Sequence, residues 1–118
     1  MKQLRPCPSS PNCVSTLAED ERHAIAPIRY RKSRAEVKEA LKEVIQSLRR
    51  IKLVEEDESY LRYEFTSLLF RFVDDVEFLF DDKAKTIHFR SASRTGYSDL
   101  GANRRRMEEV RSLIEGKL

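Results

Sequence analysis

The hydrophobic pattern of the chain changes its period near residue 50, from that of a helix to that of a strand. Before this point Ser33 and Glu36 form the pattern of a capping box, in which each side chain accepts the other residue's amide. The apolar residues that follow are three and four positions apart, namely Val37, Leu41, Val44, Ile45 and Leu48. This spacing predicts a helix over residues 34–50 with one buried face.

From residue 51 onward, apolar and polar side chains alternate. The alternation predicts four strands with one buried face, over residues 51–56, 60–66, 70–80 and 86–93. Phe70 and Phe72 belong to the apolar side of the third of these strands. Because only short polar turns separate the strands, the pattern predicts an antiparallel meander.

The N-terminal quarter of the chain has no clear period. Residues 1–24 contain both cysteines and three prolines, so we expect an extended arm that packs on or flanks the domain. Residues 24–31 predict a short edge strand, because Pro27 cannot donate a hydrogen bond to a neighbouring strand.

A second helix is predicted over residues 98–118, capped by Ser98 or Asp99. Its apolar face comprises Leu100, Met107, Val110 and Ile114. The order of elements is then β-α-β-β-β-β-α in a single domain over residues 1–118. This order predicts an α+β two-layer sandwich, in which two helices cover one face of an antiparallel sheet of about five strands.

The charge of the chain is distributed unevenly. Its 118 residues include 23 Lys and Arg against 20 Asp and Glu, a net charge of +3. The whole excess lies in residues 90–118, where seven basic side chains accompany four acidic ones. Because this charge is small and no nucleotide, cofactor or metal motif is present, we expect no nucleic acid, cofactor or metal. The expected partner is a small anion or an acidic protein surface.

The hydropathy of the chain bears on its location. No segment approaches the ~20 apolar residues that cross a bilayer, and the first residues lack the apolar region of a signal peptide. We therefore expect a cytoplasmic protein without a transmembrane segment.

Cys7 and Cys13 are the only cysteines. We expect a pair of reduced thiols in an ordered loop. A disulfide would need an oxidising compartment. A zinc site would need further ligands at zinc spacing, and a catalytic thiol would need a nearby base.

Asp74 lies on the apolar side of its predicted strand. A bulge or turn at residues 73–75 removes this conflict, and we expect one there. In a straight strand Asp74 would be a buried carboxylate that needs a partner, and an arginine from the C-terminal region is the candidate.

Arg104, Arg105 and Arg106 lie in the N-terminal half of the second predicted helix, where the helix dipole disfavours cations. Three consecutive residues point around more than half of a helix, so at least one of them faces the sheet. The expected role is pairing with carboxylates such as Asp74 and Asp75. The alternative is an anion site.

Residues 90–99, which join the last strand to the second helix, contain four small hydroxyls, two arginines and a glycine. Amides, hydroxyls and guanidinium groups at a helix N-terminus suit a phosphate or a carboxylate. A plain connection that uses Ser and Asp as helix caps explains the same residues. The candidate ligand-binding residues of this corner are Arg90, Ser91, Ser93, Arg94, Asp99, Asn103, Arg104, Arg105 and Arg106.

Four segments in order resemble the domain of unknown function 1499 family. They are CPSSPNCVS at 7–15, FVDDVE at 72–77, RSASRTG at 90–96 and DLGANRRR at 99–106. The resemblance covers about residues 4 to 115 and implies no particular activity. Many members look like envelope or organelle-lumen proteins, so the resemblance implies those locations as the alternative to the cytoplasm.

The segments that break local rules are also segments that match the family. Function or strain is expected at such places. We therefore hypothesise that the segment from Cys7 to Cys13, which we call the Cys loop, forms one site with the Asp74–Asp75 pair and the Arg-rich corner. Its further members would be Cys7, Asn12, Cys13, Asp74 and Asp75.

Three functions compete. The first is a non-enzymatic binding module whose Arg/Ser-rich corner takes an anion or a protein partner. The second is a purely structural Arg–Asp network in a protein that acts through protein–protein interaction. The third is a thiol-dependent enzyme that uses Cys7 or Cys13.

Overall fold

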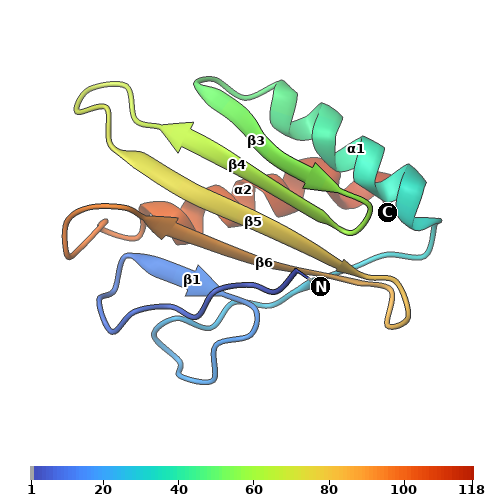
Figure 1. Ribbon diagram of the computed structural model, residues 1–118, viewed down its shortest axis with the longest axis horizontal. Helices are drawn as coiled ribbons and strands as arrows, with labels where there is room; N and C mark the ends of the chain where they lie inside the picture. The colour runs from blue at the N-terminus through green and yellow to red at the C-terminus, as the bar shows by residue number, and fades with distance from the viewer. Residues whose placement is uncertain (1) are drawn as a thin grey trace.

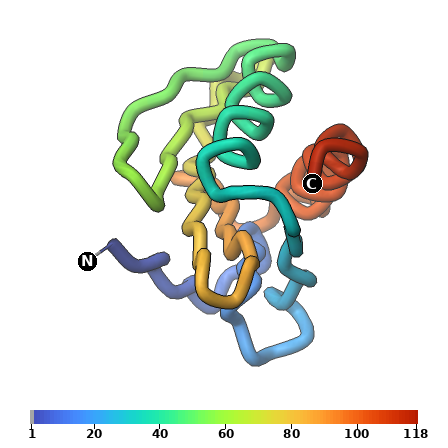
Figure 2. Tube along the Cα trace, turned by 90° about the vertical axis from the view of Figure 1, so that its right-hand side faces the viewer, coloured from blue at the N-terminus to red at the C-terminus, as the bar shows by residue number. Residues whose placement is uncertain are grey.

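In the computed structural model, which describes residues 2–118, the chain forms a six-stranded sheet with both helices on one face (Figures 1 and 2). The elements in chain order are β1 (Cys13–Ser15), β2 (Ile28–Arg29), α1 (Arg34–Gln46), β3 (Ile51–Asp57), β4 (Tyr60–Thr66), β5 (Val73–Asp81), β6 (Thr86–Ser93), α2 (Ala102–Ile114) and a 3₁₀ helix (Glu115–Lys117). The predicted α+β sandwich is confirmed. None of the helices in residues 2–118 has the length and hydrophobicity needed to cross a bilayer.

The sheet extends the predicted meander at one edge. Its order is β1-β6-β5-β4-β3, all neighbours are antiparallel, and β2 also pairs with β6. The expected arm therefore contains a strand of its own, in which Cys13 pairs with Ala92 of β6. The edge strand expected over 24–31 is reduced to two residues, which directly follow Pro27.

Helix α1 starts as predicted and ends early. Both hydrogen bonds of the capping box between Ser33 and Glu36 are present. The helix ends at Gln46, not at residue 50, and Arg50 has a left-handed φ of 57°. Its buried face, which includes Leu41 and Ile45, packs in the core; burying each such side chain contributes about 1.5–3 kcal/mol.

The prediction of a bulge or turn at residues 73–75 is wrong. Strand β5 runs straight, with Asp74 in register between Phe65 of β4 and Ser93 of β6. Asp74 is buried, and Arg106 of α2 lies 2.8 Å from its carboxylate. The partner that a straight strand would require is therefore present.

Three apolar residues expected in the core are exposed. Phe70 and Phe72 lie in the β4–β5 loop, because the Ser67 amide donates to the Phe72 carbonyl and ends the strand pairing there. Leu100 precedes α2 with a φ of 55°, because the helix begins four residues later than predicted. All three lie at the same end of the sheet.

Candidate functional site

The alternation of β6 divides the predicted corner between the two faces of the sheet. Arg90 and Arg94 point to the face opposite the helices, where their partners are carboxylates of β4 and β5. Ser91 and Ser93 point toward α2 and contact Asn103. The four residues therefore belong to two separate clusters.

On the helix-covered face, the side chain of the fully buried Asn103 is hydrogen-bonded to five residues. Its amide nitrogen donates to the Asn12 carbonyl at 3.2 Å, to Ser93 Oγ at 3.0 Å and to Asp99 Oδ2 at 2.7 Å. Its amide oxygen accepts from Ser91 Oγ at 2.6 Å and from Arg106 Nη1 at 3.0 Å. We call this group the Asn103 cluster; its members are Asn12, Asp74, Ser91, Ser93, Asp99, Asn103 and Arg106.

The Asn103 cluster joins parts of all three segments that were hypothesised to meet. Asn12 of the Cys loop also donates to the Gly96 carbonyl at 2.8 Å, and Arg106 reaches Asp74. The N-cap of α2 is Gly101 and not the expected Ser98 or Asp99, but the Asp99 carboxylate accepts the amides of Gly101 and Asn103 at the start of the helix. Burial opposes ionisation of Asp99, but these hydrogen bonds hold its pKa below the ordinary value.

The face opposite the helices carries a second group of charges, which we call the open-face network. Its members are Arg5, Tyr60, Arg62, Glu64, Asp75, Glu77, Arg90 and Arg94. Arg94 binds Asp75 through two bonds of 2.8 Å, and Tyr60 donates to Glu77 at 2.7 Å. Arg90 is buried, which lowers the pKa of its guanidinium, and Arg90 Nη1 lies 3.5 Å from Glu77.

Asp75 makes the open-face network sensitive to acid. The hydrogen bonds from Arg94 hold its pKa below the ordinary value, although burial opposes them. A depressed pKa means that the stabilisation is complete above the unfolded pKa and is lost as the pH falls through the folded pKa. We therefore expect the free energy of unfolding to fall as the pH drops below the ordinary pKa of an aspartate, about 3.9.

The measurement is denaturant unfolding at a series of pH values. Asp75→Asn is expected to be less stable than the wild type at neutral pH and to lose less stability on acidification. Glu108→Gln, which changes an exposed carboxylate of α2, is the control. An unchanged acid slope in Asp75→Asn would contradict this role of Asp75.

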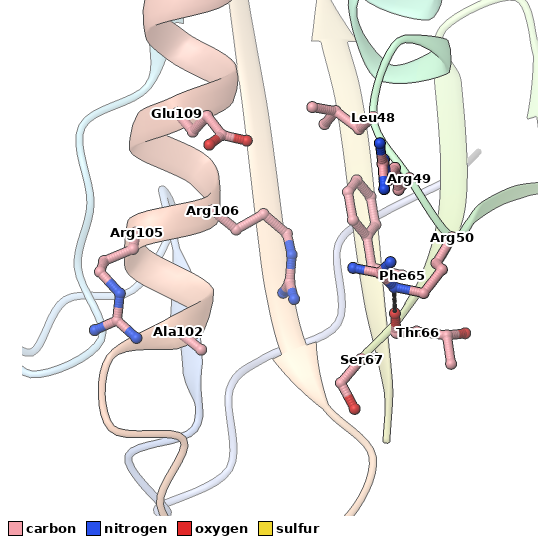
Figure 3. A pocket seen from close by; sticks show the side chains of 10 residues that line it. All are labelled: Leu48, Arg49, Arg50, Phe65, Thr66, Ser67, Ala102, Arg105, Arg106 and Glu109. Carbon is pink, nitrogen blue, oxygen red and sulfur yellow. Dashed lines mark hydrogen bonds between the residues drawn. The ribbon is translucent and has the colours of Figure 1, made fainter. Parts of the chain in front are cut away.

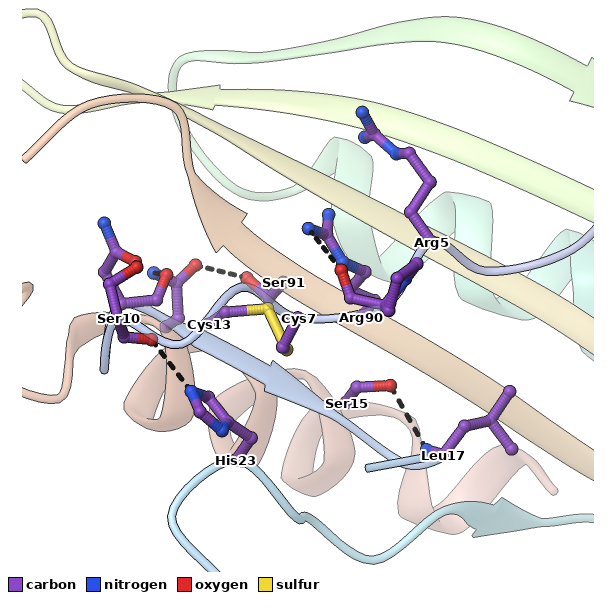
Figure 4. The surroundings of a disulfide bond; sticks show 12 residues. Arg5, Cys7, Ser10, Cys13, Ser15, Leu17, His23, Arg90 and Ser91 are labelled. Atoms are coloured by element: carbon purple, nitrogen blue, oxygen red, sulfur yellow. Dashed lines mark hydrogen bonds between the residues drawn. A yellow bond between two sulfur atoms is a disulfide. The ribbon is translucent and has the colours of Figure 1, made fainter. Parts of the chain in front are cut away.

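The N-terminal arm crosses the open face and is tied by a disulfide (Figure 4). The expected reduced thiols are not observed, because Cys7 and Cys13 are joined and the described residues hold no free cysteine. Strand β1 holds Cys13 against β6, which brings Cys7 within bonding reach. Beside the disulfide, Arg90 donates to the Pro6 carbonyl at 3.2 Å and Arg5 contacts Glu77.

The three consecutive arginines of α2 point in different directions, as predicted. Arg106 faces the sheet, Arg104 donates to the Arg22 carbonyl, and Arg105 donates to the Leu100 carbonyl. The predicted pairing with carboxylates therefore holds for Arg106, and the other two bind carbonyls.

A groove of about 590 Å³ lies beside the Asn103 cluster, between α2 and the segment that joins α1 to β3 (Figure 3). We call it the arginine groove; its lining includes Leu48, Arg49, Arg50, Phe65, Thr66, Ser67, Ala102, Arg105, Arg106 and Glu109. Figure 3 shows Arg106 from α2 and Arg50 from the opposite wall pointing into the groove. The Arg106 guanidinium lies 5.0 Å from the centre of the Phe65 ring.

Arg50 is held in place by its backbone and side chain. Its carbonyl accepts the Thr66 amide at 3.0 Å, and its Nε donates to the Thr66 carbonyl at 3.1 Å. Its φ of 57° lies in the left-handed region, which after a helix is usually occupied by glycine. The Arg50 side chain thus points into the groove from a backbone conformation that is strained for a residue other than glycine.

Arg49 and Arg50 were not among the predicted site residues. The apolar pattern of residues 34–50 put them at the end of a helix, because such a pattern alone does not show where the chain turns. The available signal was a pair of arginines directly before the change of period, where a glycine is the usual terminator.

Comparisons with known proteins agree with the resemblance seen in the sequence. No curated protein matches the chain. A family model described as "Protein of unknown function (DUF1499)" matches residues 3–114, which include the Cys loop, the Asn103 cluster and both helices. The chain therefore belongs to the DUF1499 family of proteins of unknown function.

Proposed function

We propose that the protein is a non-enzymatic module that binds a small phosphate- or carboxylate-bearing ligand in the arginine groove. The observation that carries the proposal is the convergence of Arg50 and Arg106 from opposite walls of the groove (Figure 3). Guanidinium groups suit such oxyanions because they donate two parallel hydrogen bonds.

The hydrogen-bond donors of these arginines support the proposal. Arg106 contacts Asp74 and Asn103 through Nη atoms, and this contact fixes the direction of its side chain. Arg50 bonds to protein through Nε, so among the described contacts its two Nη groups have no protein partner. Arg49 is exposed beside them. A ligand anion would thus meet at least one preoriented and one uncommitted guanidinium.

The proposed ligand site differs from the corner that the sequence predicted. Arg90 and Arg94 are already paired with carboxylates, and Ser91 and Asp99 are each hydrogen-bonded to Asn103. These pairs favour a structural role for that part of the corner. Of the predicted residues, Arg105 and Arg106 line the groove and remain candidates.

Calorimetric titration of the protein with pyrophosphate, and separately with citrate, tests the proposal. We expect Arg50→Gly to raise the pyrophosphate Kd at least about ten-fold, which corresponds to about 1.4 kcal/mol. Because glycine relieves the left-handed strain, Arg50→Gly is expected to keep or raise the Tm of the free protein. Loss of binding could not then be attributed to unfolding.

Arg104→Gln is the matched control, because Arg104 lies on α2 but does not line the groove. Its Kd is expected to equal that of the wild type. The proposal fails if the wild type binds neither anion, or if Arg104→Gln weakens binding as much as Arg50→Gly.

The disulfide bears on the compartment. We infer an oxidising compartment, such as an envelope or a lumen, in place of the cytoplasm expected from the sequence, since disulfides persist mainly under oxidising conditions. Free thiols at Cys7 and Cys13 in protein isolated under alkylating conditions would contradict this inference.

A further inference from the structure

The exposed apolar side chains of this protein gather at one end. Among residues 2–118, eight large hydrophobic side chains are exposed, and six of them lie in the β4–β5 and β6–α2 loops. These six are Leu68, Leu69, Phe70, Phe72, Tyr97 and Leu100, with exposed fractions from 55% to 85%. We call them the apolar end. Figure 1 shows both loops projecting from the same end of the sheet.

The β4–β5 loop has a defined shape that displays its side chains. The Ser67 amide donates to the Phe72 carbonyl, and the Phe72 amide donates to Ser67 Oγ, both at 2.9 Å. These bonds close the loop below its tip, so that Leu68, Leu69 and Phe70 project outward. The rings of Phe70 and Phe72 stack with centroids 5.5 Å apart.

The two loops are neighbours in the fold. Strand β5 begins with Val73, whose carbonyl accepts the Arg94 amide at 3.1 Å, directly before the β6–α2 loop. Tyr97 and Leu100 lie in the β6–α2 loop, which starts from this shared base. Isolated exposed apolar residues are ordinary, but a gathering of this kind at one end of a sheet is typical of a binding surface.

Arginines accompany the apolar end. The three connections at this end, residues 47–50, 67–72 and 95–101, contain Arg49, Arg50 and Arg71. Their one acidic residue, Asp99, is committed to the amides of Gly101 and Asn103. This end is therefore both apolar and positively charged.

The connections at the other end of the sheet have no excess of basic charge. Residues 30–33, 57–59 and 81–85 contain four acidic and four basic side chains. The basic excess therefore accompanies the apolar end alone of the two ends of the sheet.

We propose that the apolar end docks onto an anionic membrane surface. Leu68, Leu69 and Phe70 would enter the region between lipid headgroups and acyl chains, and Arg49 and Arg71 would lie against the phosphates. The apolar side chains lie on projecting loop tips. A fluid lipid surface accommodates such tips directly, whereas a protein partner would need matching hollows.

This proposal does not rest on the arginine groove. Membrane docking needs the loop tips and the basic charge around them, and the groove needs Arg50 and Arg106. Each can therefore fail alone. Binding of pyrophosphate or citrate without vesicle binding would overturn the docking, and vesicle binding without binding of either anion would overturn the groove.

Because the chain contains no tryptophan, one introduced tryptophan reports on its own position. We would mix Leu69→Trp and, as the matched control, Leu113→Trp with vesicles of phosphatidylcholine alone or with added phosphatidylglycerol. Leu113 is also exposed but lies on α2, away from the apolar end. With anionic vesicles, the Leu69→Trp emission is expected to shift to the blue and to be quenched by brominated lipid. The Leu113→Trp emission is expected to stay unchanged.

Vesicle sedimentation of otherwise wild-type chains gives the energetic test. Leu69→Ser and Phe70→Ser together are expected to lower the partition coefficient on anionic vesicles at least about ten-fold, which corresponds to about 1.4 kcal/mol. Arg71→Gln is expected to lower it less and to weaken its salt dependence. Leu113→Ser is expected to leave it unchanged.

Three results would overturn the proposal. The first is no binding of the wild type to anionic vesicles. The second is equal binding by the wild type and the Leu69→Ser, Phe70→Ser variant. The third is self-association that the same two substitutions abolish without any vesicle binding, which would assign the apolar end to a second copy of the chain.

Discussion

Asn103→Ala is expected to cause a large loss of stability. The side chain is fully buried and bonds to Asn12, Ser91, Ser93, Asp99 and Arg106. Its removal leaves several buried polar groups without partners, each at a cost of about 1–3 kcal/mol. We expect a total loss of about 3 kcal/mol in the free energy of unfolding, measured by urea denaturation and circular dichroism.

Arg104→Ala is the control for this experiment. It makes the adjacent change to alanine in the same helix, and the bond it removes is exposed. We expect its effect to stay within about 0.5 kcal/mol of zero. If Asn103→Ala were as stable as Arg104→Ala, the Asn103 cluster would not hold the Cys loop, β6 and α2 together.

Reduction of the disulfide is expected to have the second largest effect. The bond closes a loop with a sequence separation of six residues and anchors the arm that crosses the open face. Chain entropy for so short a loop predicts a loss of about 2 kcal/mol on reduction. The Cys7–Cys13 loop should also loosen, so exchange of the Ser93 amide, which donates to the Asn12 carbonyl, is expected to accelerate. Both changes are measured on native protein with and without reductant.

Cys7→Ser gives the same loss without a reductant. Cys7 is the better position because Cys13 is fully buried, where a serine would add the cost of a buried hydroxyl. Adding reductant to Cys7→Ser is expected to change nothing further. Equal stability of the reduced and oxidised wild type would show that β1 holds the arm without the disulfide.

Local periodicity was sufficient to predict the main layers of the fold. The capping box at Ser33 and the apolar spacing of α1 identify the first helix, and alternation identifies β3 to β6. The predictions that failed depend on distant partners. Strand β1 has three residues and exists because Cys13 pairs with Ala92 of β6. Asp74 stays in a straight strand because Arg106, 32 positions away, neutralises it.

The division of the predicted corner follows from the strand period itself. Arg90 and Ser91 are adjacent in a strand, so their side chains had to lie on opposite faces of the sheet. Asn103 was predicted as a site residue. Its position at the centre of a buried cluster could not be predicted, because it depends on how α2 packs on β6. The groove could not be predicted, because its opposite walls are residues 48–50 and α2.

Five of the arginines discussed above divide into two groups. Arg90, Arg94 and Arg106 are paired with carboxylates and stabilise the fold. Arg49 and Arg50 extend from a helix end without a carboxylate partner among the described residues, and Arg50 points into the groove. We infer that an external anion binds the second group. Arg106, which is paired with Asp74, would form the opposite wall of the same site.

A nuclear magnetic resonance titration of ¹⁵N-labelled protein with pyrophosphate tests this claim most directly. We expect the largest changes at the Nε–H signals of Arg50 and Arg106 and at the amides of Thr66 and Ser67, which line the groove. The Nε–H signal of Arg94, which is bonded to Asp75 on the opposite face, is expected to stay fixed. Changes centred on Arg90 and Arg94, or no saturable change at all, would contradict the claim.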